Sequence, residues 1–162
     1  MLKKLNKSKS DGFTIIEVMI VLAIAGLILL IVFLAVPALQ RNARNTQRKN
    51  DVGGLLSAVA EYSSNHQGSL PATAQFDAAF SESLPKLGYY TTPANINWDK
   101  VTAARTTNPA APAGVDSVKI YNYAKCTDAT TSTFGSGASV RSFVAMYNVE
   151  SSSGVVPQCQ ES

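Results

Sequence analysis

The stretch that decides the fold is Val18–Val36, VMIVLAIAGLILLIVFLAV, which holds nineteen residues without a charge or a strongly polar group. As an α-helix this stretch would be roughly 28 Å long, about the thickness of the hydrocarbon core of a bilayer. The surface helix of a soluble protein would keep one polar face, and this stretch has none. The pattern therefore predicts a membrane segment.

The composition of the rest of the chain limits the class of protein. The 162 residues are 46% hydrophobic and 15% charged, which suits one domain and excludes a disordered chain or a nucleic-acid-binding tail. The formal net charge of +3 arises in the first dozen residues, because the remaining acids and bases balance. The bases of this leader are Lys3, Lys4, Lys7 and Lys9, opposed by Asp11. Such a local charge gives no reason to expect a specific nucleic-acid partner.

Three kinds of membrane segment compete for this pattern. A secretory signal peptide has an apolar core of about 7–15 residues and a small-residue cleavage site, whereas this run is longer and ends in AVPAL at residues 35–39. A single-pass anchor with an extracytoplasmic binding head fits the length. It leaves Glu17 unexplained, because a carboxylate at mid-bilayer costs about 2.5–3.5 kcal/mol. The positive-inside rule does not decide the orientation, since four bases follow the run: Arg41, Arg44, Arg48 and Lys49.

The third kind rests on the residues before the apolar run, Asp11-Gly12-Phe13-Thr14-Ile15-Ile16-Glu17, and on the basic leader. Together they closely resemble the N-terminus of a type IV pilin precursor, with its class III signal peptide. The resemblance implies that a prepilin peptidase removes residues 1–12 by cutting between Gly12 and Phe13, and that Phe13 is then N-methylated. Glycine before the scissile bond leaves the backbone unobstructed.

The resemblance also implies how such a chain assembles. Glu17 takes the place of the acidic residue that pairs with the terminal amine of a neighbouring subunit and so fixes the stagger of the filament. Gly26 and Pro37 fall where pilin helices loosen or kink, and Pro37 lacks the N–H that a straight helix needs.

The function implied is that of a structural subunit of a type IV pilus, a helical homopolymer that supports adhesion, twitching motility or DNA uptake. The implied partners are further copies of the chain, the cytoplasmic membrane before assembly, the prepilin peptidase, the assembly platform and minor pilins. The leader would lie in the cytoplasm and the head outside, and the mature chain would end in a cell-surface pilus. A pseudopilin of a type II secretion or competence system shares this N-terminus and is the alternative.

The fold that the resemblance implies is α+β, with a long N-terminal helix packed on a small antiparallel β-sheet head. The residue pattern agrees with one helix from about Phe13 to Asn65, hydrophobic over residues 13–37 and amphipathic over residues 38–65. The amphipathic half carries one apolar stripe: Val52, Leu55, Leu56, Val59 and Tyr62.

The head comprises residues 66–162. We expect an irregular connection over residues 66–113, with a short helix near 76–87 and a surface loop over 102–114. Segments rich in β-branched and aromatic residues predict strands over 115–126, 139–149 and 155–159.

Cys126 and Cys159 are the only cysteines, and each lies at the end of a predicted strand. A head outside the cytoplasm favours a disulfide between them, as in the C-terminal loop of many pilins, and the bridge would contribute roughly 4 kcal/mol. His66 has no catalytic partner at a meaningful spacing, so we expect an exposed residue at the helix end. We therefore expect no enzyme activity, no metal site and no cofactor.

Overall fold

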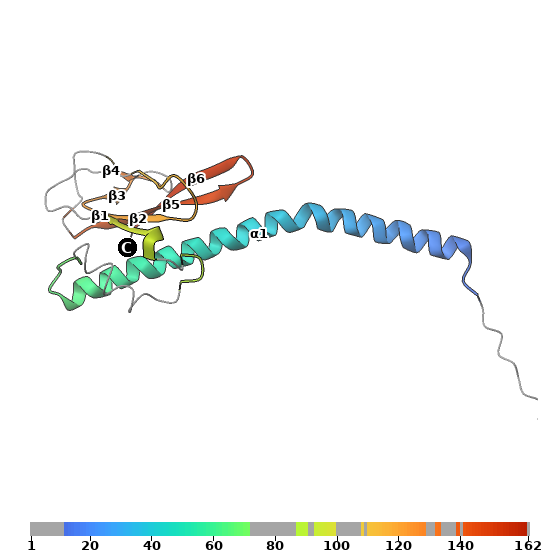
Figure 1. The fold of residues 1–162 in the computed structure, drawn as a ribbon, viewed down its shortest axis with the longest axis horizontal. Coiled ribbons are helices and arrows are strands. Elements are labelled where there is room, and N and C mark those ends of the chain that lie inside the picture. Colours follow the sequence, from blue (N-terminus) through green and yellow to red (C-terminus); the bar gives the residue numbers. More distant parts are fainter. Residues whose placement is uncertain are drawn as a thin grey trace, which may run out of the picture. The chain divides into compact units, whose positions relative to one another are not determined.

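The computed structural model describes residues 12–71, 87–90, 93–99, 108, 110–128, 132–133, 139 and 141–161. It divides into two compact units, residues 1–39 and 40–162, and one helix, α1 (Ile15–Asn65), runs through both. The other elements follow in the second unit (Figure 1). They are the 3-10 turn η1 (Pro93–Asn95) and the strands β1 (Ile96–Asp99), β2 (Val118–Asn122), β3 (Lys125–Cys126), β4 (Ser132–Thr133), β5 (Phe143–Ser151) and β6 (Gly154–Glu161).

The long helix that the sequence predicts is present, and its ends have clear causes. It continues through Pro37, whose missing N–H leaves the Phe33 carbonyl without its usual donor. It ends after Asn65 because Gln67 and Gly68 adopt positive φ angles of 56° and 83°. The Gly68 N–H then donates to the Ser63 carbonyl at 2.7 Å, which satisfies one of the free carbonyls at the helix end.

The main sheet has four strands in the order β1-β2-β5-β6. β2, β5 and β6 pair in antiparallel fashion, with Ile120 opposite Ala145 and Met146 opposite Cys159. β1 pairs in parallel with β2, Trp98 lying opposite Ile120. The α+β fold is thus confirmed. The expectation of a wholly antiparallel sheet is wrong, because the parallel pairing of β1 with β2 makes the sheet mixed.

The observed strands differ from the predicted ones in where they begin and end. The segment 115–126 is not one strand, because Tyr123 has a φ of 56°, which turns the chain between β2 and β3. The predicted strand 139–149 begins only at Phe143, since Ser139 and Ser142 close a turn before it. The predicted strand 155–159 is confirmed and belongs to the longer β6. The expected helix near 76–87 and the loop residues 102–107 lie outside the described residues, apart from Leu87.

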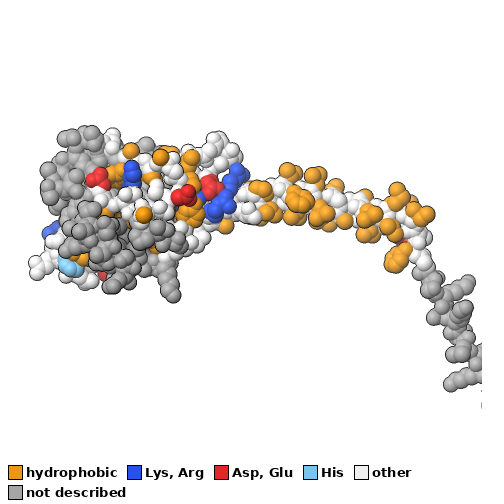
Figure 2. Space-filling view, in the orientation of Figure 1, with side chains coloured by type: hydrophobic (Ala, Val, Ile, Leu, Met, Phe, Trp, Pro, Cys, Tyr) orange, Lys and Arg blue, Asp and Glu red, His pale blue; other side chains and the backbone are white. Residues whose placement is uncertain are grey.

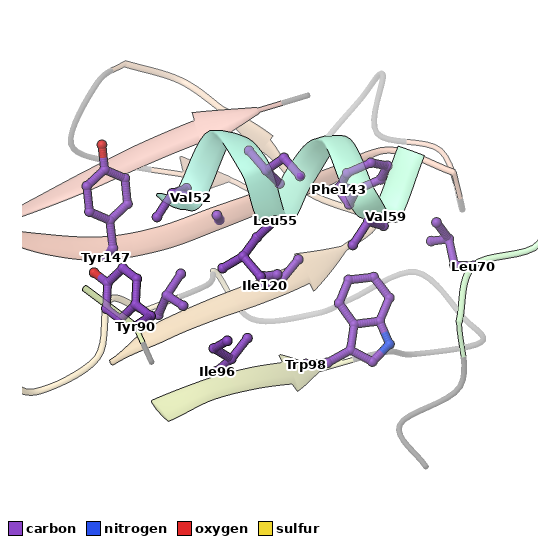
Figure 3. Close-up of a cluster of buried hydrophobic side chains, with 13 residues drawn as sticks. Val52, Leu55, Val59, Leu70, Tyr90, Ile96, Trp98, Ile120, Phe143 and Tyr147 are labelled. Carbon is purple, nitrogen blue, oxygen red and sulfur yellow. The ribbon is translucent and has the colours of Figure 1, made fainter. Parts of the chain in front are cut away.

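The main core lies between the sheet and the C-terminal half of α1. Val52, Leu55 and Val59 of the helix are fully buried, and Leu56 is almost so. They face β-strand residues such as Ile96, Trp98, Ile120 and Phe143 (Figure 3). The predicted stripe is confirmed, with Tyr62 packed at its partly buried end.

The opposite face of the sheet has a second, smaller core. It consists of Tyr121, Ala124, Val144 and Met146, packed against Ala111 and the two cysteines. The disulfide that the sequence predicts is present: Cys126 and Cys159 are bonded, with their Cα atoms 5.8 Å apart. It fastens β6 to β3 at the edge of the sheet.

Glu150, near the end of β5, is the residue on which the helix is clamped. Its carboxylate accepts hydrogen bonds from Arg44 Nε and Nη2 at 3.0 and 2.5 Å, and from Arg48 Nη2 at 2.6 Å. The Asn45 side chain bonds both the N–H and the C=O of Glu150, at 2.9 and 2.7 Å. Because β2 pairs with β5 only as far as Tyr147, the Asn45 amide closes the part of the β5 edge that β2 leaves open.

Arg48 is fully buried, so its charge depends on these partners. Its guanidinium also donates to Asn45 Oδ1 and to the Tyr89 hydroxyl, and it lies over the Tyr89 ring. The bonds from Arg44 and Arg48 hold the pKa of the Glu150 carboxyl at about 2, against an ordinary value of 4.5. Asp51 adds a second attachment, because its carboxylate accepts the backbone N–H groups of residues 88–90.

We expect Glu150→Gln to lower the free energy of unfolding by about 3 kcal/mol at neutral pH, because Arg48 remains buried without its counter-charge. The folded-state pKa lies below the unfolded one. The wild-type advantage should therefore be complete above pH 4.5 and vanish as the pH falls towards 2. Denaturant unfolding of the full-length protein in detergent micelles measures both effects.

Glu61→Gln is the matched control, because Glu61 is an exposed carboxylate of the same helix. It should change the stability by less than about 0.5 kcal/mol. A difference between wild type and Glu150→Gln that stays constant from pH 6 to pH 2 would contradict the role given to the Glu150 charge.

Candidate assembly site at the start of the helix

The helix begins with a capping box built from Thr14 and Glu17. Glu17 Oε2 accepts the Thr14 backbone N–H at 2.8 Å and the Thr14 hydroxyl at 2.7 Å. The Glu17 N–H points back to Thr14 Oγ1 at 3.3 Å. This reciprocal pattern satisfies donors that a helix N-terminus otherwise leaves free, and it makes Thr14 the N-cap of a helix that starts at Ile15.

Thr14 is a site residue that the sequence analysis missed. The signal was present, because a Thr followed three residues later by Glu, just before an apolar run, is the sequence pattern of a capping box. The capping box explains why α1 starts two residues later than expected.

The carboxylate of Glu17 is only half used. Both hydrogen bonds from Thr14 reach Oε2, and within the described part of the chain no donor reaches Oε1. A carboxylate oxygen has room for a strong charged donor. The box therefore fixes the side chain and leaves one acceptor open.

An apolar depression surrounds this carboxylate. Its lining comprises Phe13, Glu17, Val18, Val21 and Leu22, which recur at the spacing of one helix face. Phe13 is 88% exposed and Leu22 66% exposed, so the depression lacks a cover from the described residues of the chain. Its chemistry suits an apolar partner that brings one positive charge.

The exposed apolar surface extends far beyond this depression. Large hydrophobic side chains from Phe13 to Leu39 are exposed on every side of α1, and Figure 2 shows them covering the visible face of its N-terminal half. α1 is the one helix among the described residues that is long and apolar enough to cross a membrane. An apolar surface of this extent marks a lipid or protein interaction site.

The structure shows where Gly12, Gly26 and Pro37 lie but does not test their predicted roles. Gly12 is exposed just before the helix, and a Cβ built on it would meet no atom within 4 Å. Gly26 lies inside α1 with equally open surroundings, and Pro37 lies eleven residues further along the same helix. The leader residues 1–11 lie outside the described residues.

His66 follows the helix end, exposed, with its ring stacked on Tyr62 at a centroid distance of 3.9 Å. Its Nδ1 lies 2.9 Å from the Tyr62 carbonyl oxygen, which is the contact of a helix-end residue. No group of three or more His, Cys, Asp or Glu side chains that could hold a metal ion is found in the described residues.

Comparison with known proteins agrees with the chemistry of the helix start. No curated protein and no solved structure gives a significant match to the chain. Residues 7–33 match the family model of the prokaryotic N-terminal methylation motif, a range that includes Gly12, Phe13, the capping box and the first part of the apolar run. Residues 7–33 of this chain therefore carry the prokaryotic N-terminal methylation motif, which is the class III signal peptide found in type IV pilin-like precursors.

Proposed function

We propose that this protein is the structural subunit of a type IV pilus, cut after Gly12 and polymerised through its N-terminal helix. The observation that carries the proposal is the start of α1. A single carboxylate with one open oxygen lies in an otherwise apolar and exposed surface, five residues beyond the proposed cleavage site. The disulfide that ties down the C-terminal strand supports the surface filament over the pseudopilin alternative.

The chain would act as four segments. Residues 1–12 are the leader, residues 13–37 first cross the cytoplasmic membrane and then form the filament core, and residues 38–65 carry the head, residues 66–162. The prepilin peptidase removes the leader and methylates Phe13. Gly26 and Pro37 would let the apolar half change its path between lipid and filament. Glycine allows a wider range of backbone angles, and proline removes one backbone hydrogen bond of the helix.

Cleavage creates the positive charge that the Glu17 site accepts. The new amine of Phe13 has to find an anionic partner in apolar surroundings, where an unpaired charge is costly. Packing between leucine, isoleucine and valine surfaces gives adhesion with little register. A bond between Glu17 Oε1 and the Phe13 amine of the neighbouring subunit would supply that register.

We expect Gly12→Val to leave an uncut precursor in the membrane, because a branched side chain obstructs the peptidase at the scissile bond. Immunoblotting of cells would show a chain about a dozen residues heavier than the mature form. Gly26→Val is the matched control, because its Cβ also meets no atom within 4 Å, and it should be cut normally. A mature chain of ordinary size from Gly12→Val would disprove the assignment of the cleavage site.

We expect Glu17→Ala and Glu17→Gln to be inserted and cut but to form few or no filaments. The glutamine keeps an oxygen for Thr14 and loses the charge for the neighbouring amine, so it separates shape from charge. Electron microscopy of sheared surface material, with cleavage followed on the same cells, measures the outcome. Glu61→Gln, the same change at an exposed helix position, should assemble normally. Regular, abundant filaments from Glu17→Ala would show that packing alone sets the stagger.

We expect Thr14→Val to reduce the filament yield roughly fivefold, because a lost cap costs about 1 kcal/mol and releases the Glu17 carboxylate. Thr14→Ser keeps the hydroxyl and should restore the yield. Both variants should be cut, which separates a positioning role from a processing defect. Equal filament yields from the valine and serine variants would show that the Thr14 hydroxyl has no role in assembly.

A further inference from the structure

Basic side chains gather on α1 where its apolar surface ends (Figure 2). Leu39 is the last large hydrophobic residue exposed on α1, at 65%, and Arg41 and Arg44 follow two and five residues later. At the helical rise these positions lie about 3 Å and 8 Å further along the axis. The headgroup layer adds about 5–8 Å to each side of the hydrocarbon core. Measured from Pro37, the end of the proposed membrane-crossing segment, Arg41 lies about 6 Å and Arg44 about 10 Å further along the axis, so Arg41 falls at headgroup depth and the long side chain of Arg44 can reach back to it.

The positive charges of the arginines in this part of α1 exceed the negative charge of Glu150, which two of them share. Glu150 is shared between Arg44 and Arg48, so the three residues together keep one positive charge. Arg44 uses Nε and Nη2 on Glu150, its side chain remains 43% exposed, and its Nη1 reaches no partner in the described part of the chain. Arg41 has no hydrogen bond or ion pair to any described residue.

We propose that Arg41 and Arg44 form a basic collar that binds the phosphodiester groups of anionic phospholipids in the leaflet facing the head. The collar acts while the subunit waits in the membrane, and it therefore rests on the membrane stage of the proposed function. Guanidinium groups bind phosphate oxygens through paired N–H donors, and arginines that follow an apolar segment reach into the headgroups with their long side chains. The pairing would fix the depth of the helix before extraction.

The test uses the full-length protein in phosphatidylcholine vesicles that contain trace spin-labelled phosphatidylglycerol or spin-labelled phosphatidylcholine. Electron paramagnetic resonance measures the preference of the protein for the anionic label. Arg41→Gln should reduce this preference about fivefold, the effect of one basic residue at an anionic surface. Lys49→Gln is the matched control, because exposed Lys49 loses the same charge about 15 Å beyond Leu39 and should leave the preference unchanged. Arg44 is kept intact because it also binds Glu150.

The possible outcomes separate the collar from the proposed function. Unchanged preference in Arg41→Gln, or an equal loss in Lys49→Gln, would overturn the collar. Loss of the preference on addition of inorganic phosphate at constant ionic strength would assign the site to soluble phosphate and also overturn it. Vesicle flotation of the same samples reports insertion. Protein that floats without a lipid preference counts against the collar alone, and protein that does not float counts against the membrane stage itself.

Discussion

The apolar surface of α1 between Phe13 and Leu39 is the constraint on which the rest of the molecule depends. Each exposed leucine or isoleucine there gains about 1.5–3 kcal/mol when it leaves water, and nearly every side chain of this half is exposed. Such a surface requires lipid or other apolar helices. A helix that is apolar on all sides offers no preferred contact. We therefore propose that its one carboxylate, Glu17, and the threonine that orients it carry the specificity of assembly.

The second half of the same helix has a different role, because it holds the water-exposed head. It buries one stripe against the sheet and adds a polar clamp in which Arg44, Asn45 and Arg48 meet Glu150. A buried arginine contributes little net stability while it is paired, and it is strongly destabilising when a partner is removed. We therefore interpret the clamp as a device that fixes where β5 attaches along the helix.

The sequence predicts what depends on local patterns and misses what depends on distant partners. The apolar run and the stripe of the amphipathic half follow from spacing within a few turns. The TxxE cap has the same kind of local signal, but it was not among the predictions. The partners of Glu150 lie more than a hundred residues away along the chain, and no local pattern marks them. β1 has only four residues and was not predicted, because its parallel pairing with β2 depends on a long connection and not on its own composition. The roles of Gly12, Phe13, Gly26 and Pro37 depend on other proteins and stay predictions.

The central claim is that the apolar half of α1 leaves lipid and becomes buried against further copies, in a register set by Glu17. A helical reconstruction by cryo-electron microscopy of filaments sheared from cells tests it most directly. The account predicts that the subunit begins at Phe13, that residues 13–37 form the filament core, and that Glu17 Oε1 lies within about 3 Å of the Phe13 amine of a neighbouring subunit. Filaments held together by their heads, with the apolar helices outside the core or with Glu17 facing no amine, would contradict it.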